Sequence, residues 1–230
     1  RMKRTLVILA RNEIEALPKV FDHVPLSAAD ETIAVDGASS DGTAEFLRAK
    51  GLRVIVQQRR GRGEAFRLAA AEAKGETVVF FSPDGNEDPA DIPRLFAGVE
   101  AGSDMVIASR MMAGAFNEED VSWLRLRKWA NQAFTLAANL LWNRGPYITD
   151  TINGFRGMRR AVLADLKPDA EGYVIEYQLS IKAMKRGLKV SEIPTREGQR
   201  LGGHSGASAI PTGLIFLRAL WREVLLGRSA

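Results

Sequence analysis

The chain has 230 residues, 46% of them hydrophobic and 26% charged, which suits one large α/β domain, or one domain with an appendage, and excludes wholesale disorder. It contains no cysteine, so a disulfide framework and a cysteine-ligated zinc site are both excluded. The net charge of +4 fits either an ordinary basic surface or an anionic partner such as a nucleotide, a lipid phosphate or a membrane surface, but no Lys/Arg run with interleaved aromatic residues indicates nucleic acid.

Short apolar runs rich in Val and Ile alternate with helix-like segments in the first half of the chain. Continuous runs of this kind are typical of buried parallel strands, and their alternation with helices predicts a doubly wound, mostly parallel α/β sheet flanked by helices. The predicted strands are Thr5–Leu9, Thr32–Val35, Arg53–Val56, Thr77–Phe81 and Met105–Ala108. The helices predicted between them are Glu13–Phe21, Asp41–Lys50, Arg62–Lys74 and Pro89–Ala101.

After Ser109 the pattern changes to a largely helical elaboration. Loops are predicted over Met111–Asp120 and, rich in glycine, over Thr195–Ala209. The predicted helices are Ser122–Trp142, Ala161–Leu166, Ile175–Arg186 and Pro211–Leu226, and the predicted strands are Phe155–Met158 and Lys189–Ile193. The sequence contains no internal repeat, low-complexity tract or clean linker, so we expect residues 2–230 to form one domain.

No segment of the sequence predicts a membrane anchor. The run TLVILA is too short for a secretory signal, and no uninterrupted apolar stretch reaches the ~20 residues that span a bilayer. Arg1 precedes Met2, and we expect it to be a remnant of expression. We therefore expect a cytoplasmic protein.

Polar, glycine-rich or charged groups follow each of the first five predicted strands. In open α/β sheets ligands bind at the carboxyl ends of the strands, so we expect these five segments to border one ligand cleft, although any one of them alone also fits turn chemistry. The segments are Ala10–Glu13, Asp36–Thr43, Arg59–Gly63, Ser82–Asp88 and Ser109–Arg110.

Three of these segments carry candidate ligand-binding groups. Asp36 either caps a turn or hydrogen-bonds a nucleobase or ribose. Gly61 and Gly63 alone are a weak phosphate signal, but with three arginines beside them they indicate a diphosphate near the start of a helix. Asp84 follows a buried strand, where a carboxylate can bind Mg²⁺ or Mn²⁺ that bridges phosphate oxygens.

Seven motifs in a fixed order give the sequence a specific resemblance. They are LARNE, VDGASSDGT, RRGRGEAFRLAAAEAKGE, FFSPDGNEDPADIPRL, DMVIASRM, DTINGFRGMRR and EYQLSIKAMKRGLKVSEIP. From about Thr5 to Ser208 the chain resembles family 2 glycosyltransferases, and among them the dolichyl-phosphate (polyprenyl-phosphate) mannose and glucose synthases. The resemblance implies a GT-A fold, a nucleotide-sugar donor, a divalent cation and inversion at the anomeric carbon. It also implies a nucleotide-binding half, residues 2–110, and an acceptor-binding half, residues 111–230.

The resemblance places the nucleotide along the first half of the chain. LARNE is similar to the family's P-x-x-N-E, with Leu9 at the Pro position, and VDGASSDGT is similar to V-D-D-G-S-x-D-G-T, with Gly37 in place of the second Asp. Asp36 is then implied to hold the base or the ribose. The residues implied to border the donor are Ala10, Asn12, Glu13, Asp36, Ser39, Gly61, Arg62, Gly63 and Pro83.

The segment SPDGN resembles the family's metal-binding D-A-D-x-Q. Asp84 keeps the second carboxylate and Asn86 stands for the Gln, so these two are the implied ligands of Mg²⁺ or Mn²⁺. Ser82 replaces the first carboxylate, which should weaken cation binding and puts strict metal dependence in question. Glu87 is the candidate to compensate.

In the polyprenyl-phosphate branch, the segment after the fifth strand receives the lipid phosphate. Arg110 resembles the Arg of G-S-R, and Arg127 with Asn131 resembles an Arg-x-x-x-Ser pair. Arg200 and Ser205 resemble part of a late R-x-x-G-x-S-K loop, with glycine at the Lys position. These separated groups suit a phosphate acceptor, and a solvated basic face is the alternative interpretation.

A general base is needed only if the acceptor is a hydroxyl, because a lipid phosphate is already anionic. Asp150, which resembles the acid of the family's D-T/C-x-x-G-F motif, and Asp88 are the candidates, with a structural role as the alternative for Asp150. The candidate catalytic residues are therefore Asp84, Arg110, Arg127, Asp150 and Arg200.

Two predicted helices, Ser122–Trp142 and Pro211–Leu226, combine apolar, aromatic and basic residues. Such helices often lie in the membrane interface, and packing on the sheet is the alternative. We therefore expect a hexosyltransferase, peripheral at the cytoplasmic face of a membrane, that uses a GDP- or UDP-sugar and a polyprenyl-phosphate acceptor. The alternatives are a soluble or polysaccharide acceptor, a non-catalytic nucleotide-sugar-binding protein, and a nucleotidyltransferase, although LARNE lacks the glycine-rich basic first loop of the last class.

Overall fold

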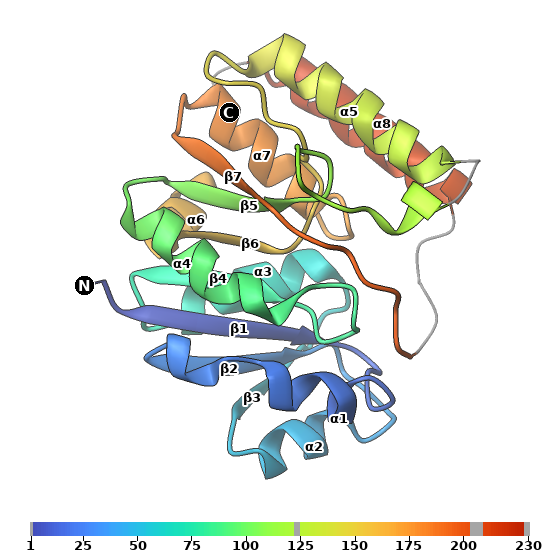
Figure 1. The fold of residues 1–230 in the computed structure, drawn as a ribbon. Coiled ribbons are helices and arrows are strands. Elements are labelled where there is room, and N and C mark those ends of the chain that lie inside the picture. Colours follow the sequence, from blue (N-terminus) through green and yellow to red (C-terminus); the bar gives the residue numbers. More distant parts are fainter. Residues whose placement is uncertain (1, 122–124, 203–208, 228–230) are drawn as a thin grey trace.

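The computed structural model describes residues 2–121, 125–202 and 209–227, and these build one seven-stranded sheet (Figure 1). The strand order is β3-β2-β1-β4-β6-β5-β7, and neighbours are parallel except that β6 runs antiparallel to β4 and β5. The strands are β1 (Arg4–Ala10), β2 (Glu31–Asp36), β3 (Arg53–Val56), β4 (Thr77–Phe81), β5 (Met105–Ser109), β6 (Arg156–Arg159) and β7 (Val190–Pro194). The predicted mostly parallel sheet is confirmed, with every strand end within one residue of its expected place.

Strand β6 is antiparallel because the chain has already returned to the carboxyl edge of the sheet before β6 begins. The hydroxyl of Ser109, at the end of β5, lies 2.6 Å from the hydroxyl of Thr149. The backbone N–H of Arg110 donates to the carboxylate of Asp150 at 3.2 Å. A strand that starts at this edge can only run back between its neighbours.

Helices account for most of the rest of the described chain. They are α1 (Leu17–Val20), α2 (Thr43–Ala49), α3 (Arg62–Glu72), α4 (Ile92–Glu100), α5 (Leu126–Trp142), α6 (Arg160–Leu166), α7 (Ile175–Lys185) and α8 (Ala209–Leu225), with 3₁₀ turns η1 (Phe21–His23), η2 (Leu26–Ala28), η3 (Pro89–Asp91) and η4 (Glu118–Val121). The helix predicted over Glu13–Phe21 is much shorter than expected. Pro18 has no N–H to donate to Ile14, so a continuous helix from Glu13 cannot form.

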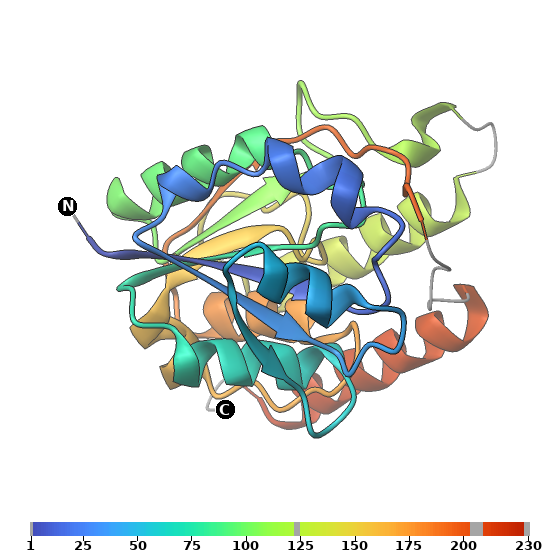
Figure 2. The same cartoon turned by 90° about the horizontal axis from the view of Figure 1, so that it is seen from below.

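The helices cover both faces of the sheet, as Figures 1 and 2 show from two directions. Side chains alternate along β1: Leu6 and Ile8 pack with α1, α2 and α4, whereas Val7 and Leu9 pack with α3, α6 and α7. Both faces of β4 and β5 are buried, so these strands are largely apolar along their whole length rather than alternating.

Helices α5 and α8 lie side by side outside α7 (Figure 1). Phe134 of α5, Tyr177 of α7 and Phe216 of α8 form an aromatic cluster with ring centroids 5.3–5.9 Å apart. Outward, the two helices expose large apolar side chains, here called the α5–α8 apolar surface: Leu126, Trp129, Leu136, Leu140, Leu141, Leu214, Ile215, Leu217, Trp221, Val224 and Leu225. In the described part of the chain, no helix combines the length and hydropathy needed to cross a bilayer.

Candidate active site

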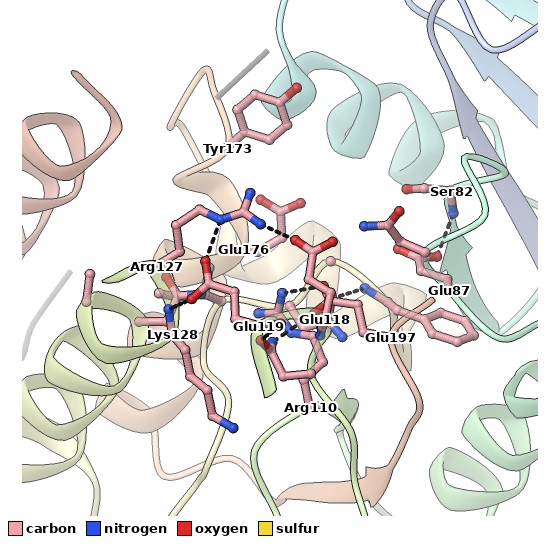
Figure 3. A pocket seen from close by; sticks show the side chains of 18 of the residues that line it. Ser82, Glu87, Arg110, Glu118, Glu119, Arg127, Lys128, Tyr173, Glu176 and Glu197 are labelled. Carbon is pink, nitrogen blue, oxygen red and sulfur yellow. Dashed lines mark hydrogen bonds and ion pairs between the residues drawn. The ribbon is translucent and has the colours of Figure 1, made fainter. Parts of the chain in front are cut away.

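A cavity of about 480 Å³ opens at the carboxyl edge of the sheet, where the segments after β4, β5 and β7 meet the starts of α5 and α7 (Figure 3). The structure brings six of the predicted site residues to its lining: Arg62, Asp84, Asn86, Arg110, Arg127 and Asn131. Carboxylates that were not predicted also line it: Glu118, Glu119, Glu176 and Glu197. The two halves of the chain therefore share one cavity.

Asp36 ends β2 and is buried, with 1% of its surface exposed. Its carboxylate accepts from the backbone N–H of Ser39 at 2.9 Å and from the Ser39 hydroxyl at 2.5 Å. The Ser39 hydroxyl in turn accepts from the backbone N–H of Asn12. Asn12 lies in the loop after β1, which ends at Ala10, and has a φ of 53°. This network joins the loops after β1 and β2, as the turn-capping interpretation of Asp36 requires, and a nucleotide contact at Asp36 stays a prediction.

Arg200 contacts the carboxylates of Glu13 and Asp84, which lie far apart in the sequence. Its guanidinium donates to Asp84 at 3.2 Å and forms an ion pair with Glu13. Burial raises the pKa of Glu13 to about 7, although Arg200 opposes the shift. The loop after β7 thus reaches back across the sheet edge to the motif that follows β4.

Two oxygen-bearing side chains of the SPDGN segment are candidate ligands of a divalent cation. Asp84 accepts from the backbone N–H of Asn86 at 3.0 Å, and the side-chain oxygen of Asn86 is buried without a hydrogen-bond partner. Mg²⁺ commonly takes one or two carboxylates and draws its other ligands from phosphates and water, so Asp84 and Asn86 fit such an ion. Among the described residues, no group of three or more His, Asp or Glu side chains is placed to hold a metal alone.

Glu87 holds the loop after β4, because one of its oxygens accepts from the backbone N–H of Ser82 at 2.6 Å. Burial and the neighbouring Asp84 raise the pKa of Glu87 to about 8. Compensation by Glu87 for the carboxylate that Ser82 lacks stays a prediction.

The predicted phosphate contact through Gly61 and Gly63 does not fit the structure. A Cβ on Gly63 would lie 1.9 Å from the carbonyl oxygen of Ala170, and one on Gly61 would lie 2.5 Å from that of Glu171. The N–H of Gly63 already donates to Glu171 at 2.8 Å. Both glycines therefore serve the close approach of the segment before α7.

Arg62 begins α3 and keeps its predicted place in the cavity. Its guanidinium forms an ion pair with Glu176 and lies 3.3 Å from the hydroxyl of Ser82, the first residue after β4. The next residue, Pro83, is buried. A Cβ on Gly154 would lie 2.2 Å from an Arg62 nitrogen, so only glycine leaves room for the guanidinium here.

We expect the Gly154→Ala variant to fold normally but to bind a nucleoside diphosphate about 10-fold more weakly, the scale of one charge-assisted hydrogen bond. The new methyl group displaces the flexible ends of Arg62 and its partner Glu176 rather than backbone. Isothermal titration calorimetry with GDP and UDP measures the effect. Gly172→Ala is the matched control, because a Cβ there meets nothing within 4 Å. Equal affinities in the two variants would remove Arg62 from the donor site.

Arg110 is held at the end of β5 by two carboxylates. It donates to Asp150 at 2.7 and 3.1 Å and to Glu197 at 3.0 Å. Burial would raise the pKa of Asp150, but Arg110 and backbone N–H donors lower it below its ordinary value. Asp150 is 1% exposed and does not line the cavity, so the structural alternative fits it better than the role of general base. Asp88 accepts from the N–H of Ala90 at 3.0 Å and caps η3.

Arg127 and Asn131 line the cavity from the first turns of α5. Arg127 forms ion pairs with Glu118 and Glu119 of η4, the second at 2.9 Å (Figure 3). Any anion that binds Arg127 must therefore compete with two carboxylates. Ser205, the last predicted acceptor residue, lies outside the described residues.

The model of glycosyl transferase family 2 matches residues 5–167, well over half of the chain. The chain belongs to glycosyl transferase family 2. The polyprenol monophosphomannose synthase of Mycolicibacterium smegmatis is 34% identical over 224 residues, covering 90% of this chain and 82% of the relative. The undecaprenyl-phosphate mannosyltransferase of Micrococcus luteus is 29% identical over 223 residues, covering 90% and 88%.

Solved structures support the same assignment. Glucosyl-3-phosphoglycerate synthase from Mycobacterium tuberculosis, in complex with Mn²⁺ and UDP-glucose, matches with a TM-score of 0.69 and 26% identity over 97% of this chain and 77% of that one. The predicted GT-A fold and the predicted glycosyltransferase family are confirmed. This family 2 glycosyltransferase thus has a structural neighbour that was solved with a divalent cation.

Proposed function

We propose that this chain transfers a hexose from a GDP- or UDP-sugar to a polyprenyl phosphate, with inversion at the anomeric carbon. The observation that carries the proposal is the shared cavity, in which the SPDGN segment and the Arg127–Asn131 face of α5 meet. The similarity to a polyprenol monophosphomannose synthase over nine-tenths of the chain supports the same acceptor. On this view residues 2–110 bind the nucleotide and residues 111–230 bind the acceptor.

The donor side of the cavity prepares the leaving group. Asp84 and Asn86 would hold Mg²⁺ or Mn²⁺, which when bound supplies positive charge to the diphosphate oxygens. Arg62 adds a guanidinium at the same motif. An acceptor phosphate oxygen attacks the anomeric carbon from the face opposite the diphosphate. A new bond forms between the anomeric carbon and the acceptor oxygen as the bond from that carbon to the diphosphate oxygen breaks. The electron pair of the broken bond leaves with the nucleoside diphosphate.

The acceptor side needs no general base for this reaction, because the attacking phosphate oxygen is already negative. Its role is to bind and orient the phosphate. Arg110 and Arg127 line the cavity from separate elements and can contact different phosphate oxygens. Asp150 then orients Arg110 instead of moving a proton.

The α5–α8 apolar surface supports peripheral contact with a membrane. The helix that carries Arg127 and Asn131 into the cavity also exposes Trp129, Leu136 and Leu140. A lipid phosphate bound in the cavity would thus leave its tail beside exposed apolar side chains. Helices of this composition bind membrane interfaces through buried apolar area and attraction to anionic lipids.

We expect Arg127→Ala to raise the KM for undecaprenyl phosphate by about 10-fold, the scale of one charge-assisted contact, without changing nucleotide affinity. Initial rates at varied lipid concentration and calorimetry with GDP and UDP measure the two quantities. Arg144→Ala is the control, because Arg144 is exposed just after α5 and does not line the cavity. An unchanged lipid KM would contradict the placement of the acceptor.

A soluble acceptor is the second candidate. Glucosyl-3-phosphoglycerate synthase from Mycobacterium tuberculosis, in complex with Mn²⁺, UDP and phosphoglyceric acid, matches with a TM-score of 0.68 and 26% identity. That small acid bears a phosphate too, so arginines in the cavity suit either acceptor. Transfer to 3-phosphoglycerate but not to undecaprenyl phosphate would favour this candidate.

A further inference from the structure

The segment of residues 151–154, here called the wall turn, lines the cavity with Ile152, Asn153 and Gly154 and is held by two buried charges of opposite sign. The Asp150 carboxylate accepts from the backbone N–H groups of Ile152 at 3.2 Å and Asn153 at 3.1 Å. From the other side Arg156 donates to the carbonyl oxygen of Asn153 at 2.9 and 2.5 Å. The anion thus takes the N–H groups of the wall turn, and the cation takes its carbonyls.

Arg156 is an unusual residue to bury. It is 0% exposed at the start of β6, and its other oxygen acceptors are neutral: the carbonyls of Thr151 at 3.4 Å and Glu176 at 3.0 Å, and the hydroxyl of Ser180 at 3.2 Å. Burial lowers its pKa to about 10, so the guanidinium remains charged at neutral pH. A buried charge without a directly paired carboxylate is costly, and an apolar residue would suit simple packing better.

The contacts of Arg156 complete a continuous path between the two sides of the cavity. On the acceptor side, Arg110 donates to Asp150, which holds the wall turn. On the donor side, Arg156 donates to the backbone of Glu176, whose carboxylate pairs with Arg62. The wall turn and Arg156 therefore lie between two guanidinium groups that line the same cavity.

We propose that Arg156 is a positioning residue that fixes Arg62 and Arg110 relative to each other, so that the diphosphate and the acceptor phosphate are aligned for transfer. The roles of Arg62 and Arg110 in this inference rest on the proposed function. The fixing of the wall turn does not. Misplacement of reacting groups by about 1 Å can cost about 10²-fold in rate, so loss of this link should appear in turnover rather than in binding.

The experiment compares Arg156→Gln and Arg156→Lys with Arg159→Gln, whose arginine lies on the same strand but pairs with Asp104 at 3.5 Å. Turnover is measured with GDP-mannose and UDP-glucose, each with undecaprenyl phosphate. Affinity for GDP and UDP is measured by calorimetry. Amide hydrogen exchange is followed in peptides that cover the wall turn and β1.

For Arg156→Gln we expect kcat to fall by about 10²-fold while nucleotide affinity and lipid KM change less than about 3-fold. Exchange should become at least about 10-fold faster in the wall turn and stay unchanged in β1. Arg156→Lys should recover part of kcat because it keeps the charge, and Arg159→Gln should behave as wild type.

A kcat for Arg156→Gln within about 3-fold of wild type would overturn the proposal. So would exchange that accelerates equally in the wall turn and β1, because that result indicates a general loss of stability. If the wild-type protein transfers sugar to no polyprenyl phosphate, the proposed function fails. The exchange measurement then decides by itself whether Arg156 holds the wall turn.

Discussion

Replacing Asp84 with asparagine is expected to lower turnover by about 10²-fold or more, the scale of several kcal/mol of phosphate charge stabilisation. Ser82 leaves no carboxylate at the first position of the motif, and an oxygen of Glu87 is engaged by the Ser82 backbone. On the proposed function, cation binding would therefore depend on Asp84. Initial rates in Mn²⁺ measure the loss, and electron paramagnetic resonance of free Mn²⁺ measures the accompanying fall in affinity.

Asp88→Asn is the matched control for this variant, because it removes a carboxylate of the same segment that caps η3 and does not line the cavity. We expect its turnover to stay close to that of wild type. Removal of divalent cations with EDTA should abolish wild-type activity and have little further effect on Asp84→Asn. Full wild-type activity in EDTA would contradict the metal role and leave charge stabilisation to Arg62 and Arg200.

The largest effect on stability is expected for Glu223→Met. Glu223 of α8 accepts from Lys185 of α7 at 2.6 Å, with side chains 2% and 0% exposed, and from Gln178 at 3.0 Å. Without this carboxylate the buried ammonium keeps its hydrogen bond to the backbone carbonyl of residue 223 at 2.9 Å and its contact over the Trp142 ring at 5.2 Å, but it loses its anionic partner. Breaking a buried pair in this way typically costs about 3–5 kcal/mol of unfolding free energy, which urea denaturation can measure.

Two comparisons make the stability result specific. Lys185→Met combined with Glu223→Met should recover most of the lost stability, because no buried charge is then left alone. Arg222→Met removes the neighbouring ion pair between Arg222 and Asp169. Because the Arg222 side chain is 52% exposed, this change should cost less than about 1 kcal/mol of unfolding free energy. If Glu223→Met is no more destabilising than Arg222→Met, the packing of α8 on α7 differs from that described.

The central strands β1, β4 and β5 could be predicted because burial on both faces makes each a largely apolar run. The helix predicted over Glu13–Phe21 is too long, because Pro18 has no N–H to donate and a continuous helix cannot run through it. The sequence did not indicate that β6 would be the antiparallel strand. That direction depends on where residues 149–150 meet the end of β5, which is a long-range contact.

The site could be predicted where its residues follow strands, as Asp84 and Arg110 do, because topology gathers the carboxyl ends of strands. Glu176 and Arg156 were missed because each lies inside a predicted helix or strand rather than in a segment that follows a strand. The signal that could have found them is the charge itself, since a buried charged residue needs partners. Gly63 was misinterpreted because the same residue type serves phosphate loops and close backbone packing.

The central claim, sugar transfer to a polyprenyl phosphate, is tested most directly by following a labelled sugar. The protein is incubated with Mn²⁺ and GDP-mannose or UDP-glucose that carries a radioactive hexose, with and without undecaprenyl phosphate, and the products are partitioned between butanol and water. We expect label in the organic phase only when the lipid is present, and little label there from Asp84→Asn. Label that stays in the aqueous phase with both donors, while 3-phosphoglycerate becomes glycosylated, would contradict it.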